Sequence, residues 1–105
     1  MMGLYLLDVN RNPVPINDVM TWATGKMNMN TTVARDEIRG ILISTVFLGV
    51  DHNFLNHGPP VLWETMIFDS DVKTNIRRYS SYEDALIGHQ QALELVLETL
   101  HGARK

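Results

Sequence analysis

The chain has 105 residues, which is the usual size of one domain and too few for two independent hydrophobic cores. Hydrophobic residues make up 45% of it and charged residues 20%, a composition that indicates a folded globular protein rather than a disordered one. The formal net charge of -3 leaves no excess of cations to neutralise a phosphate backbone, which argues against nucleic acid as a partner.

The first strand is expected at residues 3–8, a short apolar run that ends at the turn residues 10–13. Apolar residues then recur at helical spacing between residues 15 and 27, and Asn17 or Asp18 is placed to cap the first amides. This pattern predicts a short helix near the N-terminus.

Four stretches in the middle of the chain have the character of strands. The segment 32–38 is rich in β-branched residues but carries three charges, which suits an edge strand. The segments 41–50 and 61–68 are apolar at both alternating sets of positions, so we expect two central strands that are covered on both faces. After a polar turn, residues 75–79 are expected to return as a further strand.

A long helix is predicted from the capping-box spacing of Ser80 and Glu83 to Gly102. Its buried stripe is expected to consist of the residues at helical spacing, which are Tyr82, Ala85, Leu86, His89, Leu93, Val96, Leu97 and Leu100.

These elements predict a single α+β domain over residues 1–105. An antiparallel sheet of about four to five strands is packed by the long C-terminal helix, with the shorter helix near the N-terminus. One long helix can cover only one sheet face, although both central strands are apolar on two sides. A second copy of the chain is the simplest cover, so a homodimer or larger assembly is expected.

The absence of cysteine excludes disulfides and thiolate sites and fits a reducing compartment. No segment approaches the roughly 18 apolar residues of a membrane span, and the first residues lack the pattern of a signal peptide. We therefore expect a cytoplasmic protein with no membrane partner.

Glu64 is the first candidate site residue, because an ionised carboxylate inside an apolar strand needs a partner. It can form a structural pair with Arg77 or Arg78 from the neighbouring strand, or it can act as an acid, a base or a ligand-binding group. Arg78 and Tyr79 are candidates because a guanidinium group can bind a phosphate while an aromatic ring beside it stacks on a base.

Two histidines add to this set. His52 follows a central strand in a loop, where side chains often carry function, although a plain turn explains it equally well. His89 lies within the apolar stripe of the last helix and is either a hydrogen-bonded core residue or a site residue that meets Glu64 or His52. Two imidazoles and a carboxylate could ligate zinc or iron, but their spacing matches no metal motif, so no metal or cofactor is expected.

Three blocks of sequence resemble a small, uncharacterised family of bacteriophage and prophage proteins. They are STVFLGVDH at 44–52, GPPVLWETMIF at 58–68 and RYSSYEDALIGH at 78–89, against STVFLGLDH, GPPLLFETMVF and RYSTWEEAxxGH in the family. The likeness covers roughly residues 41 to 93. The chain departs from the pattern at Val50 and in the loop 53–57, which is not glycine-rich.

The resemblance implies a phage or prophage origin and no particular activity. Together with the residues above, it suggests an accessory binding protein in the host cytoplasm, such as a counter-defence inhibitor of a host protein or a sponge for a small anionic nucleotide signal. The expected ligand-binding residues are His52, Glu64, Arg78, Tyr79 and His89. A small hydrolase that uses carboxylate and histidine groups, with or without a metal, and a virion or assembly component remain the alternatives.

Overall fold

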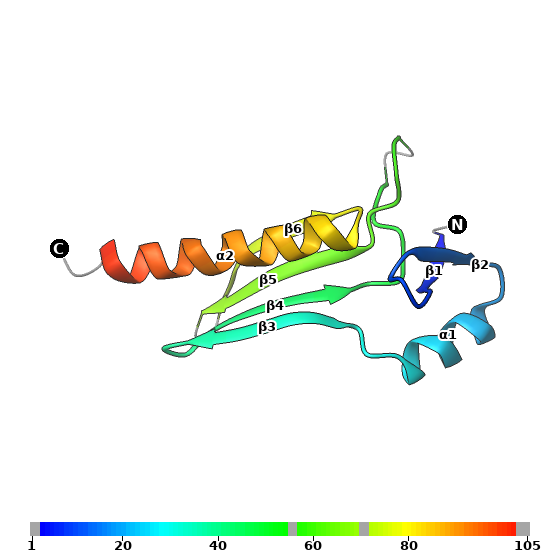
Figure 1. Cartoon of the computed structure of the whole chain (residues 1–105), viewed down its shortest axis with the longest axis horizontal. Coiled ribbons are helices and arrows are strands. Elements are labelled where there is room, and N and C mark those ends of the chain that lie inside the picture. Colours follow the sequence, from blue (N-terminus) through cyan, green and yellow to red (C-terminus); the bar gives the residue numbers. More distant parts are fainter. Residues whose placement is uncertain (1–2, 55–56, 70–71, 103–105) are drawn as a thin grey trace.

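The structure is a computed structural model that describes residues 3–54, 57–69 and 72–102. The molecule is elongated, with principal extents of 53 × 30 × 27 Å (Figure 1). Its elements in chain order are β1 (Leu4–Leu7), β2 (Pro13–Ile16), α1 (Val19–Asn28), β3 (Thr32–Ile38), β4 (Ile41–Phe47), β5 (Trp63–Asp69), β6 (Val72–Tyr79) and α2 (Tyr82–Gly102).

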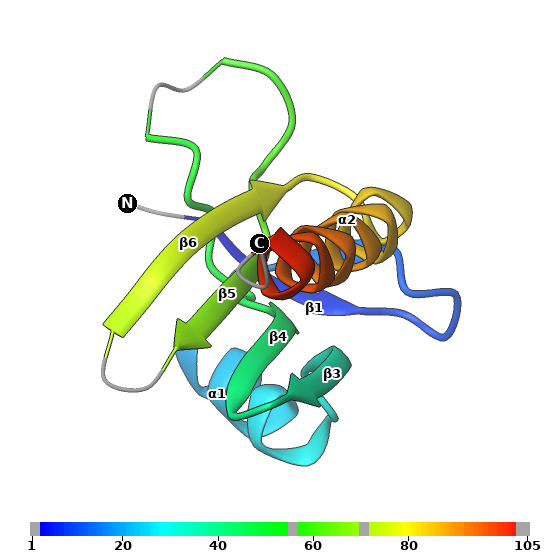
Figure 2. The same cartoon turned by 90° about the vertical axis from the view of Figure 1, so that its left-hand side faces the viewer.

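The main sheet is an antiparallel meander in the order β3-β4-β5-β6. Its first hairpin turns through Arg39 and Gly40, whose positive φ angles of 51° and 83° match the twist of the flanking strands. The helix α2 packs on one side of this sheet and contacts all four strands (Figure 2). The α+β class, the antiparallel sheet, the long C-terminal helix and the edge position of β3 are thereby confirmed.

The N-terminal region differs from the sequence-based expectation in one element. Residues 13–16 form strand β2, which pairs with β1 in a separate two-stranded ribbon, whereas the helical pattern had placed the start of the helix there. Pro13 and Pro15 explain the difference, because each proline holds the residue before it in an extended conformation. The helix begins only at Val19.

The helix α1 is capped by Asp18, whose carboxylate accepts hydrogen bonds from the Thr21 amide at 3.0 Å and the Thr21 hydroxyl at 2.6 Å. These bonds lower the pKa of Asp18, with the side-chain bond as the larger cause. The carboxylate therefore stabilises the fold at neutral pH, and this contribution is lost as the pH falls through the lowered pKa.

Two side chains of α1 join the N-terminal ribbon to the main sheet. The Trp22 indole N–H donates to the carbonyl oxygens of Tyr5 and Gly49, both at 3.1 Å. The Lys26 ammonium donates to the carbonyl of Leu48 at 2.8 Å, and partial burial lowers its pKa. Because both side chains bind backbone at the exit of β4, they hold the ribbon at the end of the main sheet.

The buried face of α2 consists of the small residues Ala85, Gly88 and Ala92 together with His89 and Val96. As expected from the sequence, Leu93 and Leu100 also pack against the core, partly buried. The expectation that Leu86 and Leu97 are buried is wrong, since they are 41% and 40% exposed. Small side chains let the helix approach the sheet closely, and the large groups that fill the interface come from the strands, above all Phe47 and Trp63.

The start of α2 also differs in detail. The hydroxyl of Ser81, and not that of Ser80, accepts the hydrogen bond from the Asp84 amide at 3.1 Å. The capping residue is therefore one position later than the capping-box spacing predicted.

Gly88 is required by the ring of Tyr79, because a Cβ atom at this position would overlap the phenol. Gly88→Ala should therefore lower the free energy of unfolding by about 1–3 kcal/mol through overpacking. Without such an overlap, alanine in a helix is favoured over glycine by up to about 1 kcal/mol. In a Tyr79→Ala background the same change should be harmless or stabilising in thermal melts, whereas stabilisation by Gly88→Ala in the unsubstituted chain would contradict the packing.

Candidate functional site

A chain of polar side chains crosses the interface between α2 and the sheet. The imidazole of His89 contacts the carboxylate of Asp36 through Nε2 and the hydroxyl of Thr45 through Nδ1, each at 2.7 Å. The chain continues from Thr45 to the hydroxyl of Thr65 at 2.5 Å, which in turn accepts from the hydroxyl of Tyr79 at 3.1 Å. It thus joins all four strands of the main sheet and the helix.

The Asp36 carboxylate fixes one end of this chain. A carboxylate only accepts, so Nε2 of His89 carries a ring proton and donates it to Asp36. With Nδ1 unprotonated, Thr45 donates to Nδ1 and Thr65 donates to Thr45 while accepting from Tyr79, so that each threonine hydroxyl donates once and accepts once.

A carboxylate, an imidazole and a hydroxyl in this order also form a nucleophilic triad. In this protein, however, Thr45 is 0% and His89 5% exposed, so a substrate cannot reach the hydroxyl while α2 is packed on the sheet. The arrangement favours the interpretation of His89 as a hydrogen-bonded core residue. Its role is to join the helix to the sheet with every polar group paired.

Three members of this chain, Asp36, Thr45 and Thr65, were not singled out from the sequence. A threonine in the middle of each of two apolar strands was the available signal. Their pairing depends on the register of β4 and β5, in which Thr45 and Thr65 are direct partners.

Glu64 lies on the opposite face of the sheet from His89, because its neighbours Trp63 and Thr65 point to α2. Its carboxylate accepts from Nε of Arg78 at 3.0 Å, and the two residues are direct partners in the pairing of β5 and β6. The interpretation of Glu64 as one half of an ion pair with Arg78 is confirmed. Within this pair only Glu64 is buried. Its side chain is 6% exposed, whereas that of Arg78 is 43% exposed.

The loop after β4 is held by its own polar groups. Asp51 accepts from the amides of Asn53 at 2.8 Å and Val61 at 2.9 Å, which closes the base of the loop. The Nδ1–H of His52 donates to the carbonyl of Val50 at 2.8 Å, and its ring lies 5.8 Å from that of Phe54. His52 thus has a local structural contact within the loop.

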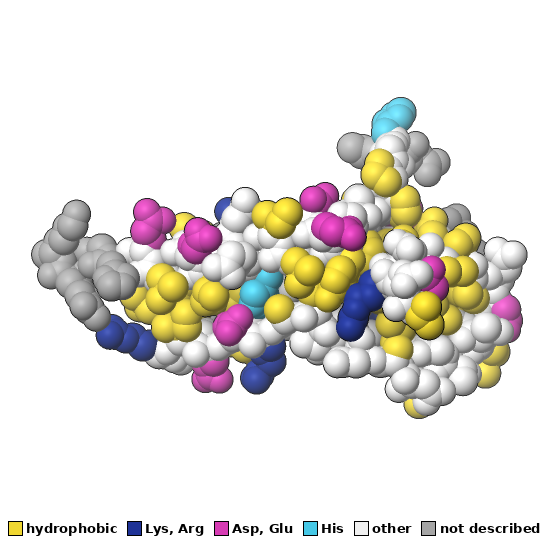
Figure 3. All heavy atoms as spheres, viewed as in Figure 1, with side chains coloured by type: hydrophobic (Ala, Val, Ile, Leu, Met, Phe, Trp, Pro, Cys, Tyr) yellow, Lys and Arg dark blue, Asp and Glu magenta, His cyan; other side chains and the backbone are white. Residues whose placement is uncertain are grey.

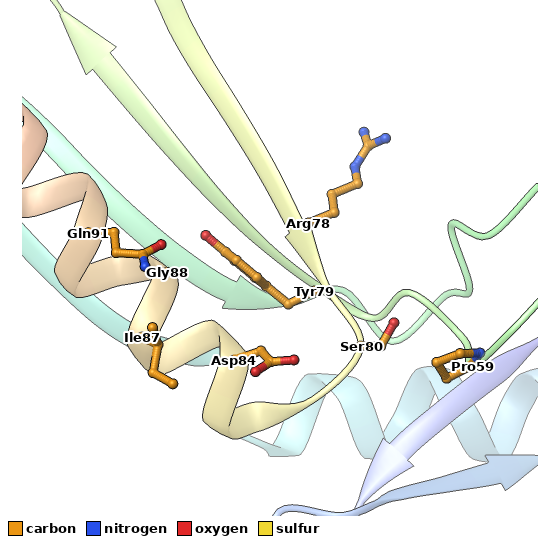
Figure 4. A pocket seen from close by; sticks show the side chains of 8 residues that line it. All are labelled: Pro59, Arg78, Tyr79, Ser80, Asp84, Ile87, Gly88 and Gln91. Carbon is orange, nitrogen blue, oxygen red and sulfur yellow. The ribbon is translucent and has the colours of Figure 1, made fainter.

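A groove of about 510 Å³ lies between β6 and the first turns of α2. In Figure 4 the Tyr79 ring lies toward α2, whereas Arg78 points away from the helix. The lining residues are Pro59, Arg78, Tyr79, Ser80, Asp84, Ile87, Gly88 and Gln91. Of the five expected ligand-binding residues, the groove therefore brings together Arg78 and Tyr79, while His52, Glu64 and His89 do not line it. A ligand-binding role for these residues stays a prediction.

Within the described parts of the chain, no three His, Asp or Glu side chains cluster as a metal site would require. Among the same residues, no helix is long and apolar enough to cross a membrane. The chain matches no protein-family model, no curated protein and no solved structure. The resemblance to the phage family stays a prediction.

The ion pair on the sheet predicts unequal effects of its two halves. Arg78→Gln should lower the free energy of unfolding by roughly 1–3 kcal/mol, because it leaves the buried carboxylate of Glu64 without its charged donor. Glu64→Gln should cost less, since the half-exposed guanidinium can turn to water. Arg77→Gln replaces the exposed arginine next to Arg78 on β6 and should change stability by less than about 0.5 kcal/mol. Equal effects of all three substitutions in urea melts would contradict this account.

The polar chain predicts a large effect of a small change. Thr45→Val keeps the shape of the side chain but leaves Nδ1 of His89 without its donor, so the free energy of unfolding should fall by about 1–3 kcal/mol. Thr99→Val, at an exposed position of α2, is the matched control and should have little effect. If both variants melt at the temperature of the unsubstituted chain, the buried chain does not stabilise the interface.

Proposed function

We propose that this protein is a non-catalytic binding protein, and that its target-binding surface is a strip of leucines along one flank of α2. The leucine strip consists of Leu86 and Leu97, which lie on one side of the helix, whereas Leu93 between them packs against the core. Leu86 and Leu97 are each about two-fifths exposed, the observation that carries the proposal. Hydrophobic side chains gather along α2 on the face shown in Figure 3.

Packing on the sheet does not account for these leucines. The close contact is made by the small residues Ala85, Gly88 and Ala92, and a helix that needed only this contact could carry polar residues on its flanks. Large apolar side chains that remain at the surface beside a completed interface are typical of protein-binding sites.

The charges beside the strip indicate the chemistry of the partner. Glu83 precedes Leu86 by three residues and Glu94 precedes Leu97 by three, so each acidic side chain is a helical neighbour of an exposed leucine. A partner that presents apolar side chains flanked by lysine or arginine would complement this surface. A basic amphipathic segment of a host protein has these properties.

The resemblance to phage and prophage proteins supports an accessory role in the cytoplasm of an infected host, such as inhibition of a defence protein. A small anionic signal in the groove beside Arg78 fits less well. The groove is also lined by Asp84, whose negative charge opposes an anion.

The proposal predicts that Leu86→Gln combined with Leu97→Gln removes target binding while the fold persists. Leu95→Gln is the matched control, because Leu95 is a leucine of the same helix with 38% exposure on a different face. A synthetic amphipathic peptide with leucines on one face and lysines on the other serves as the probe, and its scrambled version as the blank. Titration calorimetry should show binding to the unsubstituted and Leu95→Gln chains that the double variant loses.

Bacterial proteins retained from a lysate should bind to the unsubstituted and Leu95→Gln chains and be lost from the double variant. If the peptide and the retained proteins bind all three chains equally, the leucine strip is not the binding surface.

A further inference from the structure

No described helix packs on the second face of the main sheet, where Glu64 is buried and the other side chains of β4 and β5 are partly buried. The helix α2 lies on the other face, and α1 lies at the end of the sheet, against β1, β2 and the exit of β4 (Figures 1 and 2). We call this surface the open face, and define it by the side chains of β4 and β5 that alternate with those pointing to α2. They are Leu42, Ser44, Val46, Glu64, Met66 and Phe68.

Apolar side chains predominate on the open face, beside Ser44 and the Glu64–Arg78 ion pair. Leu42 and Phe68 are direct cross-strand partners, as are Ser44 and Met66, and all four are half-buried at the surface of the chain. Four of the six side chains that define the face are large and apolar, which is the composition of an interface centre rather than of a solvated sheet face.

We propose that a second copy of this chain covers the open face, so that the protein is a two-fold symmetric dimer with the two sheets packed face to face. The area of the chain supports this occupant. A folded monomer of this mass exposes about 5,900 Å², whereas this chain exposes 6973 Å². The excess of about 1,000 Å² slightly exceeds the ~800 Å² that each partner buries in a standard interface.

The radius of gyration supports the same conclusion. It is 15.4 Å, whereas a compact domain of this length has a radius of about 13 Å. The chain alone is therefore less compact than a complete globular unit, and a second layer on the open face would thicken the molecule across its short axes.

The charges at the rim of the open face fit a copy of the same surface. Arg35 and Glu37 on β3 alternate with Asp36, which turns to His89 on the covered side, so both point to the open face. A cation and an anion two residues apart on one strand can pair reciprocally with the same two residues across a two-fold axis.

The buried carboxylate of Glu64 does not oppose this arrangement. It is already bonded to Arg78, so a partner that excludes water from the open face would bury a paired charge and not an isolated one. The leucine strip lies on α2, on the other side of the sheet, and stays available for the target in such a dimer.

The test is light scattering of the whole purified chain at micromolar concentration, together with three variants. The unsubstituted chain should have twice the chain mass of 11.9 kDa. Met66→Lys places a charge in the open face and should give a monomer. Met27→Lys makes the same change at a methionine that is 85% exposed on α1, and should stay dimeric. The leucine-strip double variant should also stay dimeric, which separates a failure of this inference from a failure of the proposed function.

Ser44→Lys is the second open-face variant, because a half-buried polar position tolerates a polar side chain better than Met66 does. Thermal melts on the same samples identify the variants that are folded. If both lysine variants unfold, the isosteric Val46→Thr should still raise the dissociation constant at least about threefold, a change of ~0.7 kcal/mol. A monomeric unsubstituted chain would overturn the inference, as would folded open-face variants, Val46→Thr included, that dimerise as tightly as the unsubstituted chain.

Discussion

The close approach of α2 to the main sheet is the constraint on which the rest of the molecule depends. Alanines and Gly88 on the contact face leave room for the ring of Tyr79. That ring positions the hydroxyl that begins the polar chain to Thr65, Thr45 and His89. A larger side chain at position 88 would displace the phenol and with it the first donor. The close packing of α2 on the sheet and the hydrogen-bond chain beneath it therefore depend on each other.

Two surfaces follow from this geometry. Because small residues make the contact, the leucines of α2 remain at its flank, where they can meet a target. Because a single helix covers the sheet, no described helix packs on the partly buried apolar side chains of β4 and β5 that point the other way. The residues with the chemistry of a site, His89 and Glu64, are instead bonded to Asp36 and Arg78 within the fold. Binding through surfaces is thus the function that we propose.

The strands of the main sheet could be predicted because alternation and β-branched residues determine them locally, as in β3 and β4. The strand β2 was missed because the apolar spacing that continues into α1 outweighed the two prolines that force an extended backbone. The face of α2 was assigned to its leucines, since hydrophobicity patterns give no weight to the small residues that permit close packing.

The pairing of Glu64 with Arg78 could be inferred from a carboxylate in an apolar strand next to a basic one. The contact of His89 with Asp36 could not, because it joins residues 53 positions apart whose proximity depends on the register of β3 and on the rotation of α2.

A chain of hydrogen bonds holds α2 to the sheet through His89. Nitrogen NMR of the imidazole rings at neutral pH tests it directly, with His89→Gln used to assign the signal. We expect Nε2 of His89 to carry the proton that donates to Asp36, and the Thr45 hydroxyl proton to exchange slowly with water. An Nε2 without a proton, or a ring that interconverts freely between tautomers, would contradict the hydrogen-bond chain.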